Sequence, residues 1–249
     1  MRKPPVEPAF TVVLVYPELL GTYGDRGNLL ALLHRTRARG LSARVVEVSP
    51  SEPVPGTADL YLLGGGEDAS QLLAWEALRA DRGLRKGVSR GAPCLAVCAG
   101  FQLLSECFTG PDGVVRPGLG LLDARCGRLP GTRAVGEVVA EADGLPLPLL
   151  SGFENHQGDA RLGSSARRLG RVVSGTGNGH DAAEGAVQGA VVATYLHGPV
   201  LVRNPALADH LVQQATGREL APLTETAVER LRAERLGRSY RVGAPRPLR

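Results

Sequence analysis

The sequence predicts an α/β fold in which a doubly wound, mostly parallel sheet is flanked by helices. Its first half contains short apolar runs without the alternation of a half-exposed strand, which is typical of strands buried on both faces. Stripes of apolar residues at helical spacing separate these runs, and such alternation favours a parallel sheet. The length of 249 residues suits one large α/β domain, or one domain with a small appendage.

Strands and helices are expected to alternate along the first half of the chain. Thr11 opens a β-branched run, and a glycine-rich loop at 21–28 leads into a leucine stripe that stops at Gly40. The fourth predicted strand runs directly into Cys98, and a helix marked by apolar residues as far as Phe108 follows. The predicted strands are 11–15, 44–48, 60–63 and 94–97, and the other predicted helices are 29–40 and 69–83.

The second half is expected to contain extra β structure. A loop-rich stretch at 110–132 comes first, and a domain boundary is expected after residue 215. The C-terminal segment 216–249 is predicted to be a helix and a basic tail, with 241–249 disordered or bound to a partner. The predicted strands are 136–142, 149–153, 170–173 and 186–196, and the predicted helices are 205–215 and one from about Thr226.

Composition argues against several classes of protein. Only 4% of residues are aromatic, which leaves few rings for stacking on bases, so nucleic acid is not an expected partner. No apolar run approaches the length of a membrane span, and the N-terminus lacks the apolar core of a signal peptide. The four cysteines form no CxxC pair and no histidine follows at zinc-finger spacing, so no metal site is expected. We expect a reduced, cytoplasmic protein.

The stretch PCLAVCAGFQLL at 93–104 carries the strongest chemical signal. A predicted strand runs into Cys98, then Ala99, Gly100 and a helix follow, which is the pattern of a nucleophile elbow. Small neighbours permit the tight turn, and the helix N-terminus favours the reactive thiolate. The Ala99 amide is a candidate donor to an oxyanion.

A thiol nucleophile needs a proton acceptor that later protonates the leaving group, and histidine suits this role near neutral pH. The chain has five histidines. His197 follows the apolar run AVVATYL and precedes Gly198, so it is expected at the end of a strand, where α/β sheets present their chemistry. His156, within GFENHQG, also follows a strand and is the main rival.

Three glycines at 64–66 follow the third predicted strand, which lies beside the Cys98 strand in a doubly wound sheet. Glycines there let backbone amides approach a ligand closely, as an oxyanion requires. The pattern does not satisfy GxGxxG, so a dinucleotide fingerprint is rejected.

Together these motifs resemble the class I, cysteine-dependent glutamine amidotransferases of the cobyric acid synthase-like branch. Segment YPELLGTYGDRGN narrows the resemblance to the glutaminase subunits of lipid II isoglutaminyl synthases. The resemblance covers about 11–215, so it implies that 10–215 is the amidotransferase domain. The other segments that carry it are LLGGGED at 62–68, CLAVCAGFQLL at 94–104, GLGLLD at 118–123, GFENHQG at 152–158 and TYLHGP at 194–199.

The resemblance implies that Cys98 is the nucleophile and His197 the general base and acid, with Gly65 and Ala99 at the oxyanion positions. Many class I enzymes have a glutamate two residues after the histidine, and here Pro199 stands at that position. The chain is therefore expected to use either a dyad or an orienting carboxylate from elsewhere, for which Glu154 is the candidate. Without such an orienting group, glutaminase activity of the isolated chain is expected to be low.

The resemblance also implies a substrate pocket. Arg133 matches a residue that grips the glutamine carboxylate, and bidentate Arg–carboxylate geometry makes this chemically sensible. Gln102 and Asn155 are expected to line the same pocket.

The implied activity is hydrolysis of glutamine through a Cys thioester, with ammonia supplied to a Mur-ligase-like (MurT-like) synthetase subunit in a heterodimer. That subunit would amidate D-glutamate of lipid II to D-isoglutamine in peptidoglycan biosynthesis. The chain contains no GxxxxGK[ST] loop, so no cofactor is expected on it, and ATP and Mg are expected on the partner.

Three alternatives remain open. The first is a glutaminase component for another acceptor, such as a corrinoid carboxylate, although the chain lacks a fused nucleotide-binding domain. The second is a stand-alone thiol hydrolase or peptidase, which needs no partner. The third is a non-catalytic module that binds a ligase, for which Pro199 is the best support.

Overall fold

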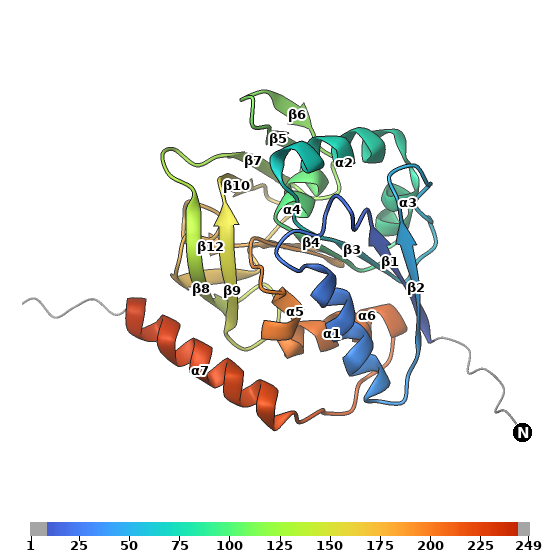
Figure 1. The fold of residues 1–249 in the computed structure, drawn as a ribbon, viewed down its shortest axis with the longest axis vertical. Helices are drawn as coiled ribbons and strands as arrows, with labels where there is room; N and C mark the ends of the chain where they lie inside the picture. The colour runs from blue at the N-terminus through green and yellow to red at the C-terminus, as the bar shows by residue number, and fades with distance from the viewer. Residues whose placement is uncertain (1–8, 244–249) are drawn as a thin grey trace, which may run out of the picture.

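The computed structural model describes residues 9–243, and a six-stranded sheet forms their centre (Figure 1). Its strand order is β13-β14-β4-β3-β1-β2, and every neighbouring pair is parallel except β13 with β14. The strands are β1 (Phe10–Val15), β2 (Ala43–Val48), β3 (Leu60–Leu63), β4 (Cys94–Val97), β13 (Ala186–Gln188) and β14 (Val191–Thr194). The predicted doubly wound, mostly parallel sheet is confirmed.

Helices cover both faces of this sheet, and each face has its own apolar core. Val13 and Val15 of β1 point into one core, whereas Val12 and Leu14 point into the other, because successive side chains of a strand alternate between faces. The first core is covered by α2 (Asp68–Ala80), α3 (Gly83–Ser89) and α4 (Ala99–Leu104). The second is covered by α1 (Arg26–Arg37), α5 (Val200–Arg203) and α6 (Pro205–Thr216).

The extra β structure forms two further sheets of four strands each. The strand order of one is β10-β7-β5-β6, and that of the other is β12-β11-β8-β9. The first contains β5 (Cys107–Thr109), β6 (Val115–Pro117), β7 (Ala124–Arg128) and β10 (Gly158–Leu162). The second contains β8 (Ala134–Ala142), β9 (Leu150–His156), β11 (Gly170–Ser174) and β12 (Ala183–Glu184).

Several predicted elements are divided in the structure. The expected helix 69–83 is two helices, because the backbone is extended at Asp81, whose carboxylate accepts a hydrogen bond from the Gly83 N–H. The expected strand 186–196 is a hairpin, since Gly189 has a φ of +57° and turns β13 back onto β14. Glycine adopts this left-handed backbone without steric cost.

The helix after Cys98 ends at Leu104, so the extension to Phe108 was wrong. Phe108 lies on β5, where its side chain is buried in the first core. The stretch expected to be loop-rich contains β6 and β7 as well as loops. The single buried Phe108 in the three-residue strand CFT fits either period, so spacing could not separate a helix end from a short strand.

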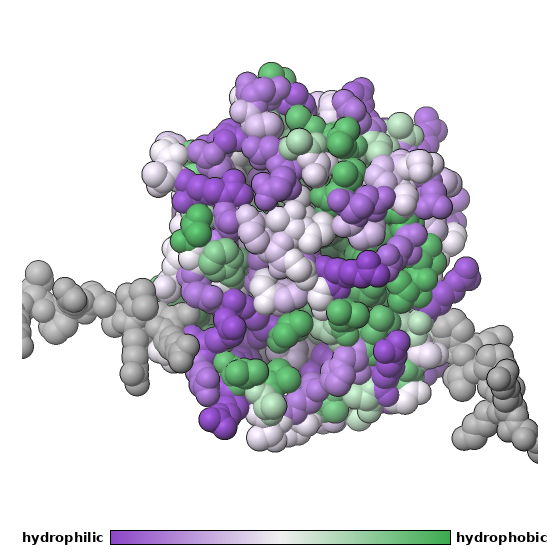
Figure 2. Space-filling model, in the orientation of Figure 1, coloured by the Kyte–Doolittle hydropathy of each residue, from purple (hydrophilic) through white to green (hydrophobic). Residues whose placement is uncertain are grey.

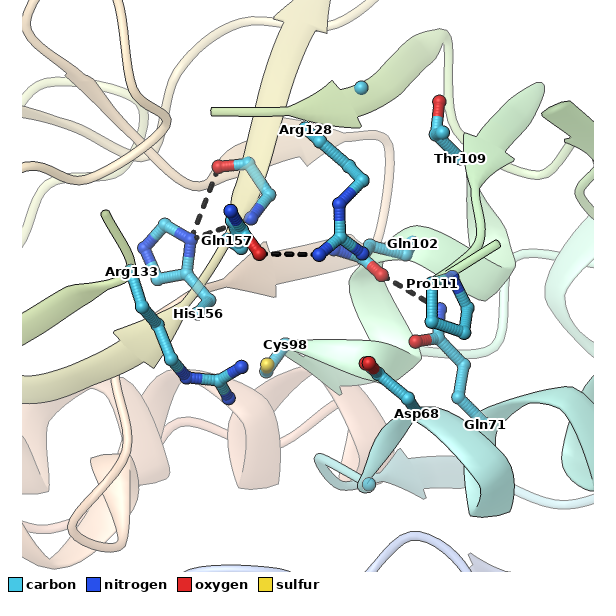
Figure 3. A pocket seen from close by; sticks show the side chains of 13 residues that line it. Asp68, Gln71, Cys98, Gln102, Thr109, Pro111, Arg128, Arg133, His156 and Gln157 are labelled. Carbon is cyan, nitrogen blue, oxygen red and sulfur yellow. Dashed lines mark hydrogen bonds between the residues drawn. The ribbon is translucent and has the colours of Figure 1, made fainter. Parts of the chain in front are cut away.

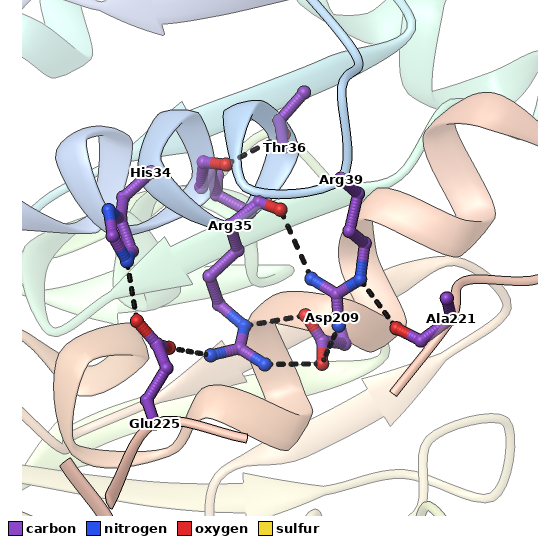
Figure 4. Close-up of polar contacts among 8 residues, drawn as sticks. His34, Arg35, Thr36, Arg39, Asp209, Ala221 and Glu225 are labelled. Carbon is purple, nitrogen blue, oxygen red and sulfur yellow. Dashed lines mark hydrogen bonds and ion pairs between the residues drawn. The ribbon is translucent and has the colours of Figure 1, made fainter. Parts of the chain in front are cut away.

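α7 (Thr226–Gly243) follows the predicted boundary at 215 and packs on β8 and β11. The segment that leads into it is held by Arg35 of α1 (Figure 4). Arg35 Nε lies 2.6 Å from Asp209 Oδ1 on α6, and Arg35 Nη1 lies 2.6 Å from Glu225 Oε2. Arg39 Nη2 adds a contact of 2.9 Å to Asp209 Oδ2. The Arg35–Glu225 pair joins the segment before α7 to the α/β body, and the pairs with Asp209 tie Arg35 and Arg39 to α6.

The surface around α7 is mixed in character, with hydrophobic patches among polar side chains (Figure 2). Exposed Leu30, Val202 and Leu231 belong to α1, α5 and α7. No helix within residues 9–243 has the length and apolar character needed to cross a membrane. Of the predicted disordered tail, 241–243 end α7, and 244–249 lie outside the described residues.

Candidate active site

Cys98 stands at a sharp turn between β4 and α4. Its φ of 51° and ψ of −101° are unusual for a residue with a side chain, and such strain is typical of a nucleophile elbow. The Cys98 N–H donates to the Thr194 carbonyl at 2.9 Å, and the Gly100 N–H donates to the Gly64 carbonyl at 3.2 Å. A side chain at Gly100 would come within 2.9 Å of Leu63 Cβ, so the turn requires a glycine there.

His197 follows β14, the strand next to β4, and is brought beside Cys98 by that pairing. Two backbone hydrogen bonds with Phe153 of β9, of 2.8 and 3.1 Å, hold His197 in place. Both functional side chains flank Gly65: a methyl group there would lie 2.6 Å from His197 Cε1 and 3.4 Å from Cys98 Cβ. The structure thus brings together the three predicted residues Cys98, His197 and Gly65.

Asp25 is a functional residue that the sequence patterns did not single out. It lies at the end of the glycine-rich loop before α1, and its carboxylate is 3.2 Å from His197 Nδ1. The same carboxylate accepts a hydrogen bond of 2.6 Å from the Gly65 N–H. Both the Asp25 and His197 side chains are only 1% exposed, so the contact is shielded from water.

Glu154 does not orient His197, contrary to expectation. Its two oxygens accept hydrogen bonds from the N–H groups of Thr176 and Gly177, at 2.8 and 2.9 Å. It also lies 3.5 Å from His156 Nε2. The orienting carboxylate is therefore Asp25, supplied by a segment 172 residues away in the chain.

The electrostatic surroundings of His197 favour its charged form. Burial by itself lowers the pKa of His197, but the Asp25 carboxylate and the Cys98 sulfur outweigh burial and raise that pKa to about 10. Nδ1 is the ring nitrogen that faces Asp25, and Nε2 is buried and makes no hydrogen bond with any described residue. Because the side chains of His197 and Cys98 both lie beside Gly65, Nε2 is the ring nitrogen available for proton exchange with the sulfur.

His156, the rival histidine, has different surroundings. Its ring stacks on Tyr195 at a centroid distance of 3.9 Å, and its Nδ1 accepts the Gly158 N–H at 3.2 Å. It lines the pocket next to Cys98, but its nearest carboxylate is Glu154. His156 is thus part of the pocket wall.

Two backbone N–H groups near Cys98 are candidate oxyanion donors. The N–H of Ala99 has no hydrogen-bond partner within residues 9–243, and neither has that of Gly66, which lines the Cys98 pocket. The N–H of Gly65 is already engaged by Asp25. Gly65 contributes the space in which His197 and Asp25 meet, and Gly66 becomes the second candidate donor.

Polar side chains from several elements line the pocket at Cys98 (Figure 3). Gln102 lies in its wall, where its Oε1 accepts a hydrogen bond of 2.7 Å from Gln71 Nε2. Arg133 extends toward Cys98 from the segment before β8. Asn155 is not one of the lining residues: its side chain accepts a hydrogen bond from Arg133 Nε, and its Nδ2 donates to Tyr23 Oη at 2.5 Å. Asn155 therefore positions Arg133.

Residues 11–205 match the family model of the CobB/CobQ-like glutamine amidotransferase domain. The chain belongs to this family. It is 33% identical over 222 residues to the lipid II isoglutaminyl synthase (glutamine-hydrolyzing) subunit GatD of Staphylococcus aureus (strain N315), covering 88% of this chain and 89% of that one. It is 32% identical to the GatD subunit of Streptococcus pneumoniae (strain ATCC BAA-255 / R6), covering 81% of this chain and 78% of that one. Cobyric acid synthase of Methylobacterium nodulans is 37% identical, but only 32% of its length is matched.

Solved structures support the amidotransferase fold. A crystal structure of a glutamine amidotransferase matches with a TM-score of 0.56 and 23% identity, covering 82% of this chain and 98% of that one. The glutaminase domain of Trypanosoma brucei CTPS, with bound acivicin, matches with a TM-score of 0.51 and 11% identity. The match covers 85% of this chain and 96% of that one. At these identities the likeness concerns the fold alone.

Replacing Gly65 by alanine in this amidotransferase is expected to lower the kcat for glutamine hydrolysis by about 10²-fold, because small misplacements of catalytic groups have effects of that size. The added methyl group would lie 2.6 Å from His197 Cε1 and 3.2 Å from Asp25 Oδ2, so the imidazole must move. Ammonia release by the purified variant measures the effect. Gly136→Ala is the control, since a methyl group there meets no atom within 4 Å. Wild-type kcat in Gly65→Ala would contradict the position assigned to His197.

Proposed function

We propose that this chain is the glutaminase subunit of a lipid II isoglutaminyl synthase. It would release ammonia from glutamine for a Mur-ligase-like (MurT-like) partner, which amidates D-glutamate of lipid II to D-isoglutamine. The observation that carries the hydrolytic step is the arrangement of the half-buried Cys98 and the buried His197 and Asp25 around Gly65. The acceptor is supported by the two GatD relatives, which this chain matches over most of their length, whereas it matches about a third of cobyric acid synthase.

The first half of the reaction uses a thiolate–imidazolium pair. The Cys98 thiolate attacks the δ-carboxamide carbon of glutamine, so that a C–S bond forms and the carbonyl oxygen becomes an oxyanion. The N–H groups of Ala99 and Gly66 donate hydrogen bonds to this oxygen. His197 Nε2 then gives its proton to the amide nitrogen, the C–N bond breaks, and ammonia leaves. Asp25 stabilises the imidazolium until that transfer occurs.

The second half hydrolyses the thioester. His197 is now neutral, and its Nε2 accepts a proton from a water molecule that attacks the thioester carbon. The tetrahedral species collapses, the C–S bond breaks, and glutamate is released. The proton that His197 gained restores the thiolate–imidazolium pair. Arg133 binds the α-carboxylate of the substrate in both halves.

We place ATP binding on the partner subunit and both subunits in the cytoplasm. ATP and Mg belong to the synthetase subunit, and glutamine hydrolysis uses the side chains and backbone N–H groups of this chain together with water. A cytoplasmic location fits four free cysteines, since such compartments keep thiols reduced.

The test is co-expression with candidate Mur-ligase-like subunits, followed by amidation of lipid II with glutamine labelled at the amide nitrogen. We expect the label in the α-amide of D-isoglutamine, and we expect unlabelled ammonium to dilute it. As the control for the glutaminase step, the ligase without this chain should amidate lipid II with ammonium but not with glutamine. Transfer of label to a corrinoid carboxylate and not to lipid II would reject the proposed acceptor.

A further inference from the structure

The pocket at Cys98 contains charged side chains of both signs that are not paired with each other. Asp68, the first residue of α2, directs its carboxylate into the pocket, and Arg133 extends from the opposite side of Cys98 (Figure 3). Asp68 makes no hydrogen bond or ion pair with any residue of the described range 9–243. The guanidinium groups of Arg133 and Arg128 bond only neutral groups, on Asn155 and Gln157.

Several arginines elsewhere in the molecule, unlike Arg128 and Arg133, form ion pairs. Arg26, Arg171 and Arg203, for example, each lie against a glutamate carboxylate. An exposed carboxylate can be solvated without a partner, so the lack of a partner for Asp68 alone would identify no site. What indicates a binding site is that Asp68 lies beside the nucleophile and across the pocket from Arg133.

The proposed substrate has complementary charges. Glutamine carries an α-carboxylate and an α-ammonium group on one carbon, at the end of the molecule opposite the carboxamide that Cys98 attacks. A guanidinium matches the first group and a carboxylate matches the second, because charge-assisted hydrogen bonds are the strong and directional ones. We infer that Asp68 binds the α-ammonium group of the substrate while Arg133 binds its α-carboxylate. This inference rests on the proposed function.

Asp68 is then a specificity residue for α-amino acid amides. Asp68 binds a group that is remote from the reacting carbon. Removing the Asp68 carboxylate should therefore weaken substrate binding more than it slows the chemical step. The effect should disappear for a substrate without the ammonium group. Glutaramate, which is glutamine without its α-amino group, is such a substrate.

The experiment compares Asp68→Asn with wild type on both substrates, in the preparation in which the wild type releases ammonia from glutamine. We expect kcat/KM for glutamine to fall about 10- to 100-fold, mainly through KM, because one charged hydrogen bond is lost. The kcat/KM for glutaramate should be unchanged within about twofold. Glu67→Gln is the matched control: it removes the same charge one residue earlier, outside the pocket lining, and should leave both substrates unaffected.

Two results would overturn the inference. Equal losses on glutamine and glutaramate would show that Asp68 acts on folding or on the chemical step, and an unchanged kcat/KM for glutamine would show that it does not bind substrate. In both cases the wild type still hydrolyses glutamine, so the proposed function stands. A wild type that hydrolyses neither amide, with or without its partner, overturns the proposed function and the inference together.

Discussion

Replacing Cys98 by alanine is expected to lower glutamine hydrolysis by at least about 10⁴-fold, since losing the nucleophile of an acyl-transfer enzyme has effects of this order. The structure offers no substitute thiol in the pocket, because Cys98 is the one cysteine among its lining residues in the described part of the chain. Ammonia release measures the loss. Mass spectrometry of the intact protein should show a glutamyl adduct in wild type after rapid acid quenching and none in the variant.

Cys107→Ala is the matched control for this change. Cys107 is a free, half-buried cysteine on β5, outside the pocket lining, so its removal should leave hydrolysis near the wild-type rate. Supply of ammonium should restore lipid II amidation by the Cys98→Ala complex, because the synthetase step does not use this sulfur. Residual hydrolysis within tenfold of wild type would reject Cys98 as nucleophile, and with it the thioester route.

The nucleophile was predictable because its signal is local. A strand, a cysteine, two small residues and a helix are consecutive in the sequence, and the turn at Cys98 has the strained backbone that this pattern predicts. The position of His197 beside Cys98 was predictable from the topology of a doubly wound sheet alone. The strands that precede the two residues, β4 and β14, are neighbours, so their carboxyl ends meet at one edge.

Asp25 was not predictable in the same way, because its contact with His197 depends on how two distant segments dock. Three contacts join the segment GDRGN to the segment after β14. The Asp25 carboxylate lies 3.2 Å from His197 Nδ1. Gly27 packs so closely on Pro199 that a Cβ there would lie 2.3 Å from Pro199 Cγ. Asn28 Oδ1 accepts a hydrogen bond of 2.9 Å from the Leu201 N–H. Neither segment shows this pairing by its own spacing.

The same docking explains the proline two residues after the histidine. Pro199 packs against Gly27 at the start of α1, so the chain after His197 is turned onto that helix. A carboxylate at position 199 is not needed there, because α1 already brings Asp25 to the imidazole. The departure from the glutamate of many class I enzymes therefore marks a different source of the orienting group. It gives no support to a non-catalytic module.

Replacing Asp25 by asparagine is expected to lower kcat for glutamine hydrolysis by about 10²- to 10⁴-fold, as when a histidine loses its orienting carboxylate elsewhere. The Gly65 N–H is a donor, so the amide oxygen of asparagine should turn toward it. The amide NH₂ then faces His197 Nδ1 and requires that nitrogen to accept. The proton is left on Nε2, in a neutral tautomer that cannot take a proton from the thiol.

The pH dependence gives an independent readout with a definite sign. Asp25 and Cys98 raise the pKa of His197 to about 10, so the wild type keeps the imidazolium that protonates the departing amide nitrogen until the pH rises through that range. Loss of the Asp25 charge removes part of this stabilisation and lowers the pKa of His197. The alkaline limb of kcat/KM against pH should therefore move to lower pH in Asp25→Asn.

Asp143→Asn is the control for Asp25→Asn. Asp143 forms an exposed ion pair of 2.6 Å with Arg168, away from the pocket lining, so its neutralisation should change neither kcat nor the position of the alkaline limb. If Asp25→Asn lowered kcat but left the alkaline limb in place, Asp25 would act through the geometry of Gly65 alone. The electrostatic part of its role would then be wrong, because a carboxylate that stabilises an imidazolium must move that titration when it is removed.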